Sequence, residues 1–132
     1  MSEEGIVAMR GLFAAFKRRD LDAVAGFLDP ALEIRPAVVG GPEGVVYRGP
    51  EGMRRFWSEI DSAWEEFELS PEEFRSLDGG VLVLGRVMAR GKASGIKLDA
   101  EAAWLARISD GKLVDFRSFT SQDEALEAAE RE

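Results

Sequence analysis

Hydrophobic and polar residues alternate over residues 98–108, near the C-terminal end of the chain. One row of this segment contains no polar residue and consists of Leu98, Ala100, Ala102, Trp104, Ala106 and Ile108. The other row carries Asp99, Glu101 and Arg107. A period of two residues predicts a β-strand with one dry face and one wetter face. Because the dry row is mostly alanine around one tryptophan, we expect open space beside this face, and hence a pocket.

Three further segments have the pattern of strands. Residues 113–120 follow the first strand through Asp110-Gly111, and Asp-Gly is among the strongest signals for a tight hairpin. Residues 81–90 form a strong strand, whereas residues 64–76 alternate weakly and contain Pro71. Because proline cannot donate to a ladder of hydrogen bonds, residues 64–76 are predicted as an edge strand or a bulged strand.

The first half of the chain has mainly the spacing of helices. Residues 2–19 carry apolar residues at helical intervals. Asp20 is the expected N-cap of a short helix over residues 21–28, which ends at Asp29-Pro30. A third helix begins at Gly49-Pro50, where the missing N–H of proline does no harm. Its predicted buried face consists of Met53, Phe56, Trp57 and Ile60.

The predicted order is α-α-β-α-β-β-β-β-α, with a short strand over residues 32–35 and an apolar, glycine-containing loop over residues 36–46. Helices followed by an antiparallel meander indicate an α+β fold. In this fold three N-terminal helices pack on a curved antiparallel sheet, and a short helix over residues 123–131 ends the chain. The 132 residues contain no repeat and no boundary in composition, so we expect a single domain over residues 1–132.

Composition narrows the chemistry. The chain has no cysteine and no histidine, so thiolates and the commonest general acid/base and metal ligand are excluded, and we expect no metal and no cofactor. A net charge of −8 argues against nucleic acid and against a membrane surface as partners. Arg10 and Gly11 interrupt the apolar N-terminal segment, which therefore resembles neither a signal peptide nor a membrane span. A cytoplasmic protein is expected.

Three segments carry a resemblance to a known family. AAFKRRDLDAVAGFLDPALEIRP (14–36), YRGPEGMRRFW (47–57) and WLARISDGKLVDFRSF (104–119) resemble the NTF2-like superfamily, and more narrowly its SnoaL-like polyketide cyclase and ketosteroid-isomerase-like branch. The resemblance implies a cone-shaped α+β barrel with a deep apolar pocket at its wide end. It also implies a homodimer formed through the sheets.

The acid and base residues of ketosteroid isomerases are not matched in this chain. The position of their tyrosine in the first helix falls at about Leu12, and their general-base aspartate before a proline corresponds to Arg35. The closest match to their second acid is Trp104. A shared fold does not establish an activity, so the resemblance leaves the reaction open.

Arg35 and Tyr47 are the candidate catalytic residues. Arg35 maps onto the pocket wall, where its planar guanidinium could bind a carboxylate or an enolate. The alternative is an ion pair with an internal Asp or Glu, or a side chain that reaches solvent. Tyr47 lies where the apolar loop meets the third helix, and it either donates a hydrogen bond into the pocket mouth or holds the loop in place.

The predicted pocket lining consists of Leu12, Phe16, Phe56, Trp57, Trp104, Phe116 and Ser118. Flat aromatic walls suit ring-bearing ligands, although core packing is the alternative for each aromatic residue. Two functions follow: an enzyme of isomerase, cyclase or dehydratase type acting on an apolar carbonyl compound, or a non-catalytic binding module or accessory subunit for an apolar metabolite. In a third alternative the homodimer interface is itself the function.

Overall fold

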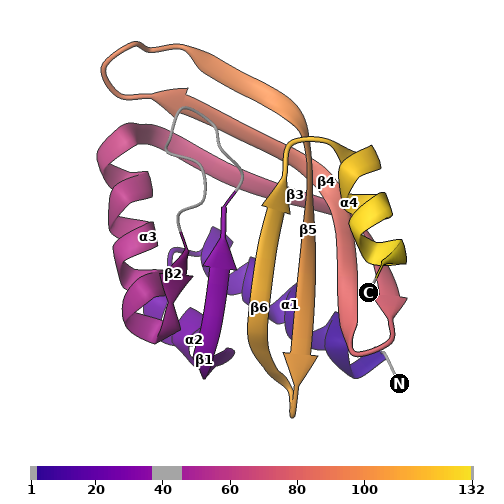
Figure 1. Ribbon diagram of the computed structural model, residues 1–132. Helices are drawn as coiled ribbons and strands as arrows, with labels where there is room; N and C mark the ends of the chain where they lie inside the picture. The colour runs from indigo at the N-terminus through magenta and orange to yellow at the C-terminus, as the bar shows by residue number, and fades with distance from the viewer. Residues whose placement is uncertain (1–2, 37–45, 132) are drawn as a thin grey trace.

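The computed structural model describes residues 3–36 and 46–131, and a single curved sheet with helices on both sides dominates it (Figure 1). The elements are α1 (Glu3–Lys17), α2 (Leu21–Ala25), β1 (Leu28–Arg35), β2 (Tyr47–Arg48), α3 (Gly49–Ala63), β3 (Trp64–Leu77), β4 (Gly80–Gly91), β5 (Lys97–Ser109), β6 (Lys112–Phe119) and α4 (Gln122–Glu130). The predicted α+β class is confirmed, with the two-residue strand β2 added before α3. Within the described residues, no helix has both the length and the apolar character needed to cross a membrane.

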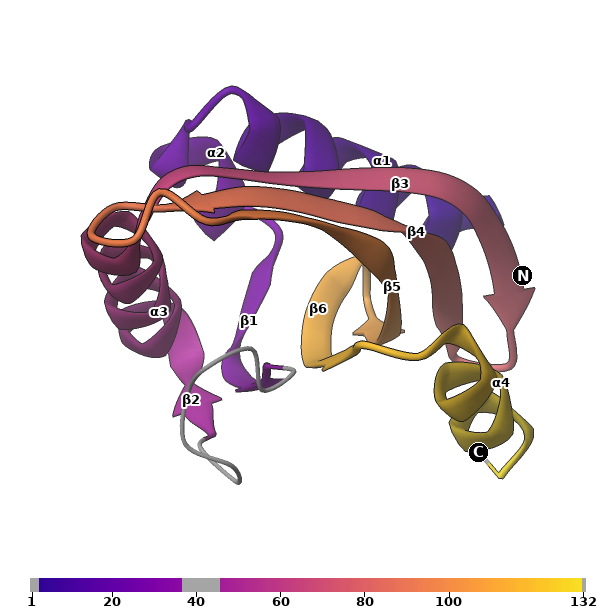
Figure 2. The same cartoon turned by 90° about the horizontal axis from the view of Figure 1, so that it is seen from above.

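The six strands lie in the order β2-β1-β6-β5-β4-β3. β1 runs parallel to β6, and every other neighbouring pair is antiparallel. The sheet bends strongly but does not close, because β2 and β3 are its two ends and α3 lies at the open side between them (Figure 2). The barrel implied by the resemblance is therefore an open, cup-like sheet whose hollow side faces α1 and α3.

Turn and proline signals locate two features of the sheet correctly. Asp110 and Gly111 have φ values of 52° and 74° and join β5 to β6, as a tight hairpin turn requires. β3 is an edge strand, and its register with β4 shifts after Pro71. Both outcomes follow from the backbone limits of single residues, which act locally and can be predicted without knowing the fold.

The segment around α2 differs from the prediction. Asp20 does cap α2, accepting a hydrogen bond from the backbone nitrogen of Ala23 at 3.1 Å, but the helix ends at Ala25 and β1 already begins at Leu28. Pro30 is tolerated in β1 because the register with β6 is interrupted between Leu28 and Glu33. The predicted loop over residues 36–46 lies outside the described residues, apart from Pro36 and Val46.

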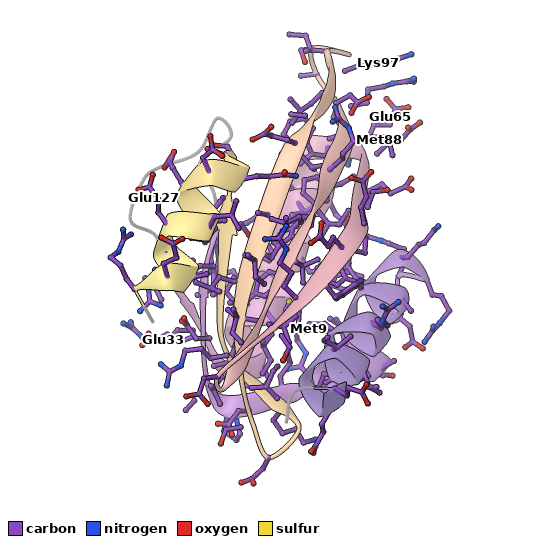
Figure 3. The ribbon with its side chains drawn as sticks, turned by 90° about the vertical axis from the view of Figure 1, so that its right-hand side faces the viewer. Met9, Glu33, Glu65, Met88, Lys97 and Glu127 are labelled. Atoms are coloured by element: carbon purple, nitrogen blue, oxygen red, sulfur yellow. The ribbon has the colours of Figure 1, made fainter. Side chains whose placement is uncertain are left out.

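Both faces of the sheet bury apolar side chains. On the hollow side, Met9 of α1, which is labelled in Figure 3, is 1% exposed. It belongs to the same core as Val83 and Trp104. On the outer side, α4 covers a second cluster containing Leu82, Leu84, Ala103, Leu105, Ala125 and Ala128. Leu82 and Leu84 of β4 point away from the hollow side of the sheet, as do Ala103 and Leu105 of β5. These side chains are nevertheless buried, because they belong to the cluster that α4 covers. Alternation within a strand cannot reveal this, because the covering helix comes later in the chain.

Candidate functional site

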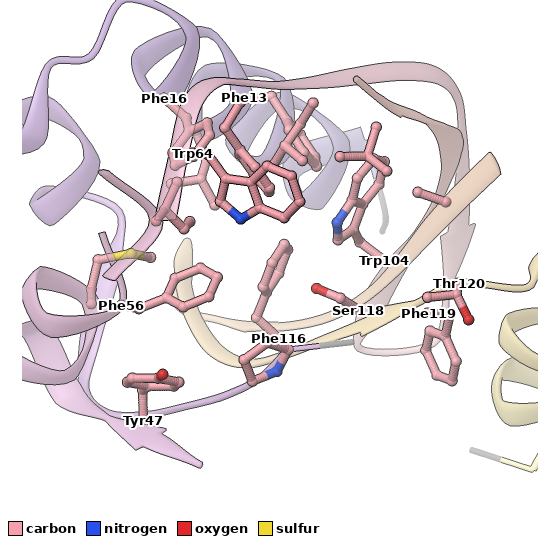
Figure 4. Close-up of a pocket in the computed structure, with 18 of the residues that line it drawn as sticks. Phe13, Phe16, Tyr47, Phe56, Trp64, Trp104, Phe116, Ser118, Phe119 and Thr120 are labelled. Carbon is pink, nitrogen blue, oxygen red and sulfur yellow. The ribbon is translucent and has the colours of Figure 1, made fainter. Parts of the chain in front are cut away.

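A cavity of about 510 Å³ lies between the hollow side of the sheet and the helices α1 and α3 (Figure 4). Most of its wall is apolar, and the aromatic members are Phe13, Phe16, Tyr47, Phe56, Trp64, Phe67, Trp104, Phe116 and Phe119. Ala100 and Ala102 of β5 also line it, and their short side chains leave room beside Trp104. These aromatic residues lie on α1, on α3 and on strands of the sheet, and folding brings their rings around one space.

The predicted lining residues Leu12, Phe16, Phe56, Trp104, Phe116 and Ser118 all line this cavity. Trp57 does not. It is 8% exposed and packs against Phe16, with ring centroids 4.9 Å apart, while the guanidinium of Arg19 lies 4.6 Å from the centre of its ring. Trp57 follows Phe56 directly in α3, and adjacent helical residues do not share a face. It is therefore a packing residue between α3 and α1.

Arg35 is not among the residues that line the cavity. Its guanidinium donates hydrogen bonds to Asp115 of β6 and to Glu33 of its own strand. In the register of β1 with β6, Ile34 lies opposite Phe116 and Arg35 opposite Arg117. Because side chains alternate along a strand, Ile34 and Phe116 face the hollow side and Arg35 faces outward. The structure thus brings Arg35 to an ion-pair cluster rather than to the pocket.

Tyr47 lies in the cavity wall, and its hydroxyl donates a hydrogen bond to the carboxylate of Glu59 on α3. Glu59 lines the same cavity. Arg55, one turn earlier on α3, lies 3.8 Å from Glu59 and 4.9 Å from the centre of the Tyr47 ring. The hydrogen bond to the Glu59 carboxylate raises the pKa of Tyr47, and burial raises it further. Tyr47 is consequently a protonated donor at neutral pH.

Trp104 and Ser118 place two further polar groups on the opposite part of the wall. They are directly opposite each other in the pairing of β5 with β6, and both line the cavity. Trp104 is 3% exposed, and its ring meets Phe13 edge-on with centroids 5.1 Å apart. In Figure 4 the indole nitrogen of Trp104 and the hydroxyl of Ser118 point toward the open space in front of Phe116.

Glu101 and Thr120 line the cavity. Both lie near the beginning of α4, as Figure 4 shows for Thr120. The carboxylate of Glu101 accepts a hydrogen bond from the backbone nitrogen of Gln122 at 2.9 Å. Gln122 begins α4, so the free N–H groups and the helix dipole stabilise this carboxylate. Among the described residues of the wall, the formally charged side chains are Glu59 and Glu101, and both are acidic.

No described group of three or more carboxylates is arranged to hold a metal ion. The polar groups of the cavity wall include the phenol of Tyr47, the carboxylates of Glu59 and Glu101, the indole of Trp104, and the hydroxyls of Ser118 and Thr120.

Residues 9–116 match the SnoaL-like domain. The chain belongs to the SnoaL-like family. No curated protein matches the sequence. The solved structures that share the fold of this SnoaL-like protein include NTF2-like and ketosteroid isomerase-like proteins. An NTF2-like protein of unknown function from Burkholderia pseudomallei is 22% identical, with 98% of each chain covered and a TM-score of 0.80.

A protein from Jannaschia named as a SnoaL-like polyketide cyclase is 17% identical over 97% of this chain and 92% of its own, with a TM-score of 0.77. A protein with a ketosteroid isomerase-like fold from Catenulispora acidiphila, in complex with trimethylamine, is 13% identical over 93% of this chain and 92% of its own. Its TM-score is 0.75. At these identities the likeness establishes the fold alone.

Glu59 and Glu101 are the charged residues of the described wall, and the predicted lining contained neither of them. A signal for Glu59 was present, because it lies three residues after Phe56 on α3 and so shares the face predicted to be buried. Glu101 belongs to the wetter row of β5, and its place in the cavity wall depends on α4, which it contacts through Gln122. No pattern within β5 could have indicated that contact.

Proposed function

We propose that this SnoaL-like protein binds an apolar, ring-bearing small molecule in the cavity between α1, α3 and the sheet. The observation that carries the proposal is the aromatic wall around about 510 Å³ of open space. Ligand pockets of this kind typically span roughly 300–1,000 Å³ and combine an apolar wall with a few polar groups. Phe16, Phe56, Trp64 and Phe116 supply flat apolar surfaces against which fused rings can stack.

Charge in the wall favours a neutral ligand over an acidic one. Glu59 and Glu101 are acidic, and residues 37–45 of the sequence contain no lysine or arginine that could add a cation. A negatively charged carboxylate ligand would enter a site whose charged residues are also negative, and it would find no cation among the described residues of the wall to pair with. Removing an unpaired carboxylate from water is costly. The trimethylamine bound by the Catenulispora protein agrees with a pocket for small molecules in this fold.

Binding can be tested by NMR titration with a panel of uncharged cyclic ketones and the hydrocarbons of the same skeleton. The variant Ala100→Phe should fill the cavity and weaken binding of every ligand at least about tenfold. Lys97→Phe is the matched control, because Lys97 is exposed and does not line this cavity. Equal affinities of the two variants would contradict the proposed site.

Tyr47 and Glu59 support a second candidate function, which is proton transfer at a carbon next to a ligand carbonyl. In this reaction the Glu59 carboxylate takes a proton from that carbon, and the electron pair of the broken C–H bond moves to the carbonyl oxygen to form an enolate. Glu59 then returns a proton to carbon. Tyr47 hydrogen-bonds Glu59 and orients its carboxylate. Binding without catalysis is favoured instead by the 55% exposure of the Glu59 side chain.

Deuterium incorporation next to the carbonyl of the bound ketones in heavy water separates these two functions. If Glu59 is the base, exchange on the protein exceeds exchange in buffer, and Glu59→Gln abolishes the excess while binding persists. Glu51→Gln is the matched control, because Glu51 is an exposed carboxylate on the same helix outside the cavity wall. If the bound ketones exchanged deuterium only at the rate seen in buffer, the protein would be a binding module without this catalytic activity.

The homodimer and the cytoplasmic location stay predictions. Arg86 and Met88 of β4 lie on the outer row of that strand, and both are exposed. They form a surface that a second copy could cover. Light scattering coupled to gel filtration tests the expected dimer.

A further inference from the structure

Trp104 combines near-complete burial with a polar group that faces the cavity. Its side chain is 3% exposed in total, and in Figure 4 the indole nitrogen is turned toward the open space rather than toward a neighbouring strand. Buried indole N–H groups usually have a hydrogen-bond partner. Within residues 3–36 and 46–131, no acceptor for this N–H is found. The donor is therefore available to something inside the cavity.

Ser118 adds a second polar group beside that donor. The pairing of β5 with β6 places Ser118 directly opposite Trp104, so their side chains are neighbours on one face of the sheet. The Ser118 hydroxyl also points into the cavity, and it too has no hydrogen-bond partner among the described residues (Figure 4). A hydroxyl can rotate to donate or accept, whereas an indole N–H can only donate.

We infer that Trp104 and Ser118 form an anchor for an acceptor oxygen on a neutral ligand, such as a ketone, quinone or lactone carbonyl. The inference rests on the proposed binding function and names the class of ligand. A carbonyl oxygen has two lone pairs, so it can accept from the indole N–H and from the hydroxyl at the same time. An ammonium group cannot accept, and it therefore leaves the indole N–H without a partner.

The position of the anchor also sets the minimum size of a ligand that uses the whole site. Figure 4 shows Trp104 and Tyr47 on different sides of Phe116, with Phe56 on the side of Tyr47. A ligand whose carbonyl is bound at the anchor and whose other end reaches Tyr47 must extend past the Phe116 ring. A ligand of that extent can place flat rings against the aromatic residues of the wall.

The test uses α-tetralone, a bicyclic ketone, and tetralin, the hydrocarbon of the same skeleton. Both are titrated by NMR into the wild-type protein and into Trp104→Phe and Ser118→Ala. Trp57→Phe is the matched control, because Trp57 is a buried tryptophan outside the cavity wall. Comparing the two ligands on one variant cancels any change in the shape of the pocket, since both ligands experience it equally.

The wild-type protein and Trp57→Phe should bind the ketone about threefold to tenfold more tightly than the hydrocarbon, as one or two net hydrogen bonds provide. Trp104→Phe and Ser118→Ala should each reduce this ratio. The indole N–H signal assigned through Trp104→Phe should move downfield with α-tetralone and stay in place with tetralin. The shift itself is measured on the wild-type protein, and Trp104→Phe is needed only to assign the signal.

Three results would overturn the inference. Equal affinity of the wild-type protein for ketone and hydrocarbon would remove the anchor while leaving the proposed binding function intact. A ketone preference that is unchanged in both Trp104→Phe and Ser118→Ala would place the oxygen elsewhere. Absence of binding by either ligand, and by every member of the ketone panel, would remove the proposed function and the anchor with it.

Discussion

Tyr47, which lies just before α3, donates a hydrogen bond from its phenol to the carboxylate of Glu59 in the second half of that helix. Tyr47 belongs to β2, and Glu59 lies on the cavity side of α3, so the bond ties the end strand of the sheet to the helix at its open side. Phe56 packs against the Tyr47 ring with centroids 5.2 Å apart. The pair therefore has a structural role whether or not it moves a proton.

The titration of Tyr47 should report this bond directly, because the chain contains a single tyrosine. The carboxylate of Glu59 raises the pKa of Tyr47 above the ordinary value of 10.0. We expect ultraviolet titration of tyrosinate to give a midpoint above that of a model tyrosine. Glu59→Gln should bring the midpoint down toward it, since the negative charge that opposes ionisation is gone. A midpoint unaffected by Glu59→Gln would contradict the hydrogen bond.

The same shift makes stability depend on pH in the alkaline range. Because the folded pKa lies above the unfolded value, the folded state holds the Tyr47 proton more tightly. The stabilisation is complete below the unfolded pKa of about 10, and it is lost as pH rises through the folded pKa. Urea unfolding should show the difference in free energy between wild type and Tyr47→Phe shrinking over this interval. Tyr47→Phe itself should cost about 1 kcal/mol at neutral pH.

Arg35 provides a contrasting prediction, because it lies outside the cavity wall. Arg35→Met should leave the affinity for uncharged ketones unchanged. It removes the cation that hydrogen-bonds Asp115, whose side chain is only 14% exposed, so we expect a loss of roughly 1 kcal/mol in the free energy of unfolding. The 43% exposure of Arg35 limits the loss through solvent screening. If Arg35→Met instead weakened ketone binding and left the free energy of unfolding unchanged, Arg35 would have to be part of the binding site.

Trp104 lines the cavity as predicted, whereas Arg35 does not. The comparison of these two residues shows how far the sequence determines the site. Trp104 lies in an unbroken apolar row, and the alternation of β5 fixes the face on which it points. Arg35 precedes a proline in a short strand, where the sequence cannot show which face meets the core. Its orientation depends on the parallel register with β6, which is formed by residues about eighty positions away. Local periodicity therefore predicts long strands well and short ones poorly.

Contacts between a residue of the cavity wall and a second element could not be predicted from the sequence for a similar reason. Glu101 contacts the start of α4 and Tyr47 contacts Glu59 on α3, and neither contact is encoded in spacing within one element. The hairpin at Asp110-Gly111 and the bulge at Pro71 were predictable because single residues impose them. The sequence therefore predicted the fold and the wall residues Tyr47, Trp104 and Ser118, whereas the carboxylates Glu59 and Glu101 became apparent only from the packing of distant elements.

Gly85 is a position where the bent sheet leaves no room for a side chain. A Cβ atom built there would lie 2.1 Å from the backbone oxygen of Ser70 on β3. The Gln122 side chain also donates to the Gly85 carbonyl at 3.2 Å, so β4 cannot easily move away. We expect Gly85→Ala to lower the free energy of unfolding by about 3 kcal/mol or more.

Gly26→Ala is the control for that substitution. Gly26 is exposed at the end of α2 with a φ of −64°, which any residue adopts. Its replacement should change the free energy of unfolding by less than about 1 kcal/mol. Chemical denaturation of both variants measures the difference. Similar losses for Gly85→Ala and Gly26→Ala would mean that β3 and β4 are not held as closely as described.

The charge of the ligand should matter more than its size within the apolar part of the site. A tetralin that carries a carboxylate in place of the ketone should bind at least about tenfold more weakly than α-tetralone, because it brings a negative charge toward Glu59 and Glu101 and loses its hydration. Glu59→Gln and Glu101→Gln, which remove the negative charges of the wall, should reduce this difference in affinity between the two ligands. Added salt should reduce the same difference in the wild-type protein, because it screens the charges. Glu51→Gln, which lies outside the wall, should leave it unchanged. If the carboxylate instead binds the wild-type protein as tightly as the ketone does, a cation must face the cavity when the ligand is bound, and the assignment of a neutral ligand would be wrong.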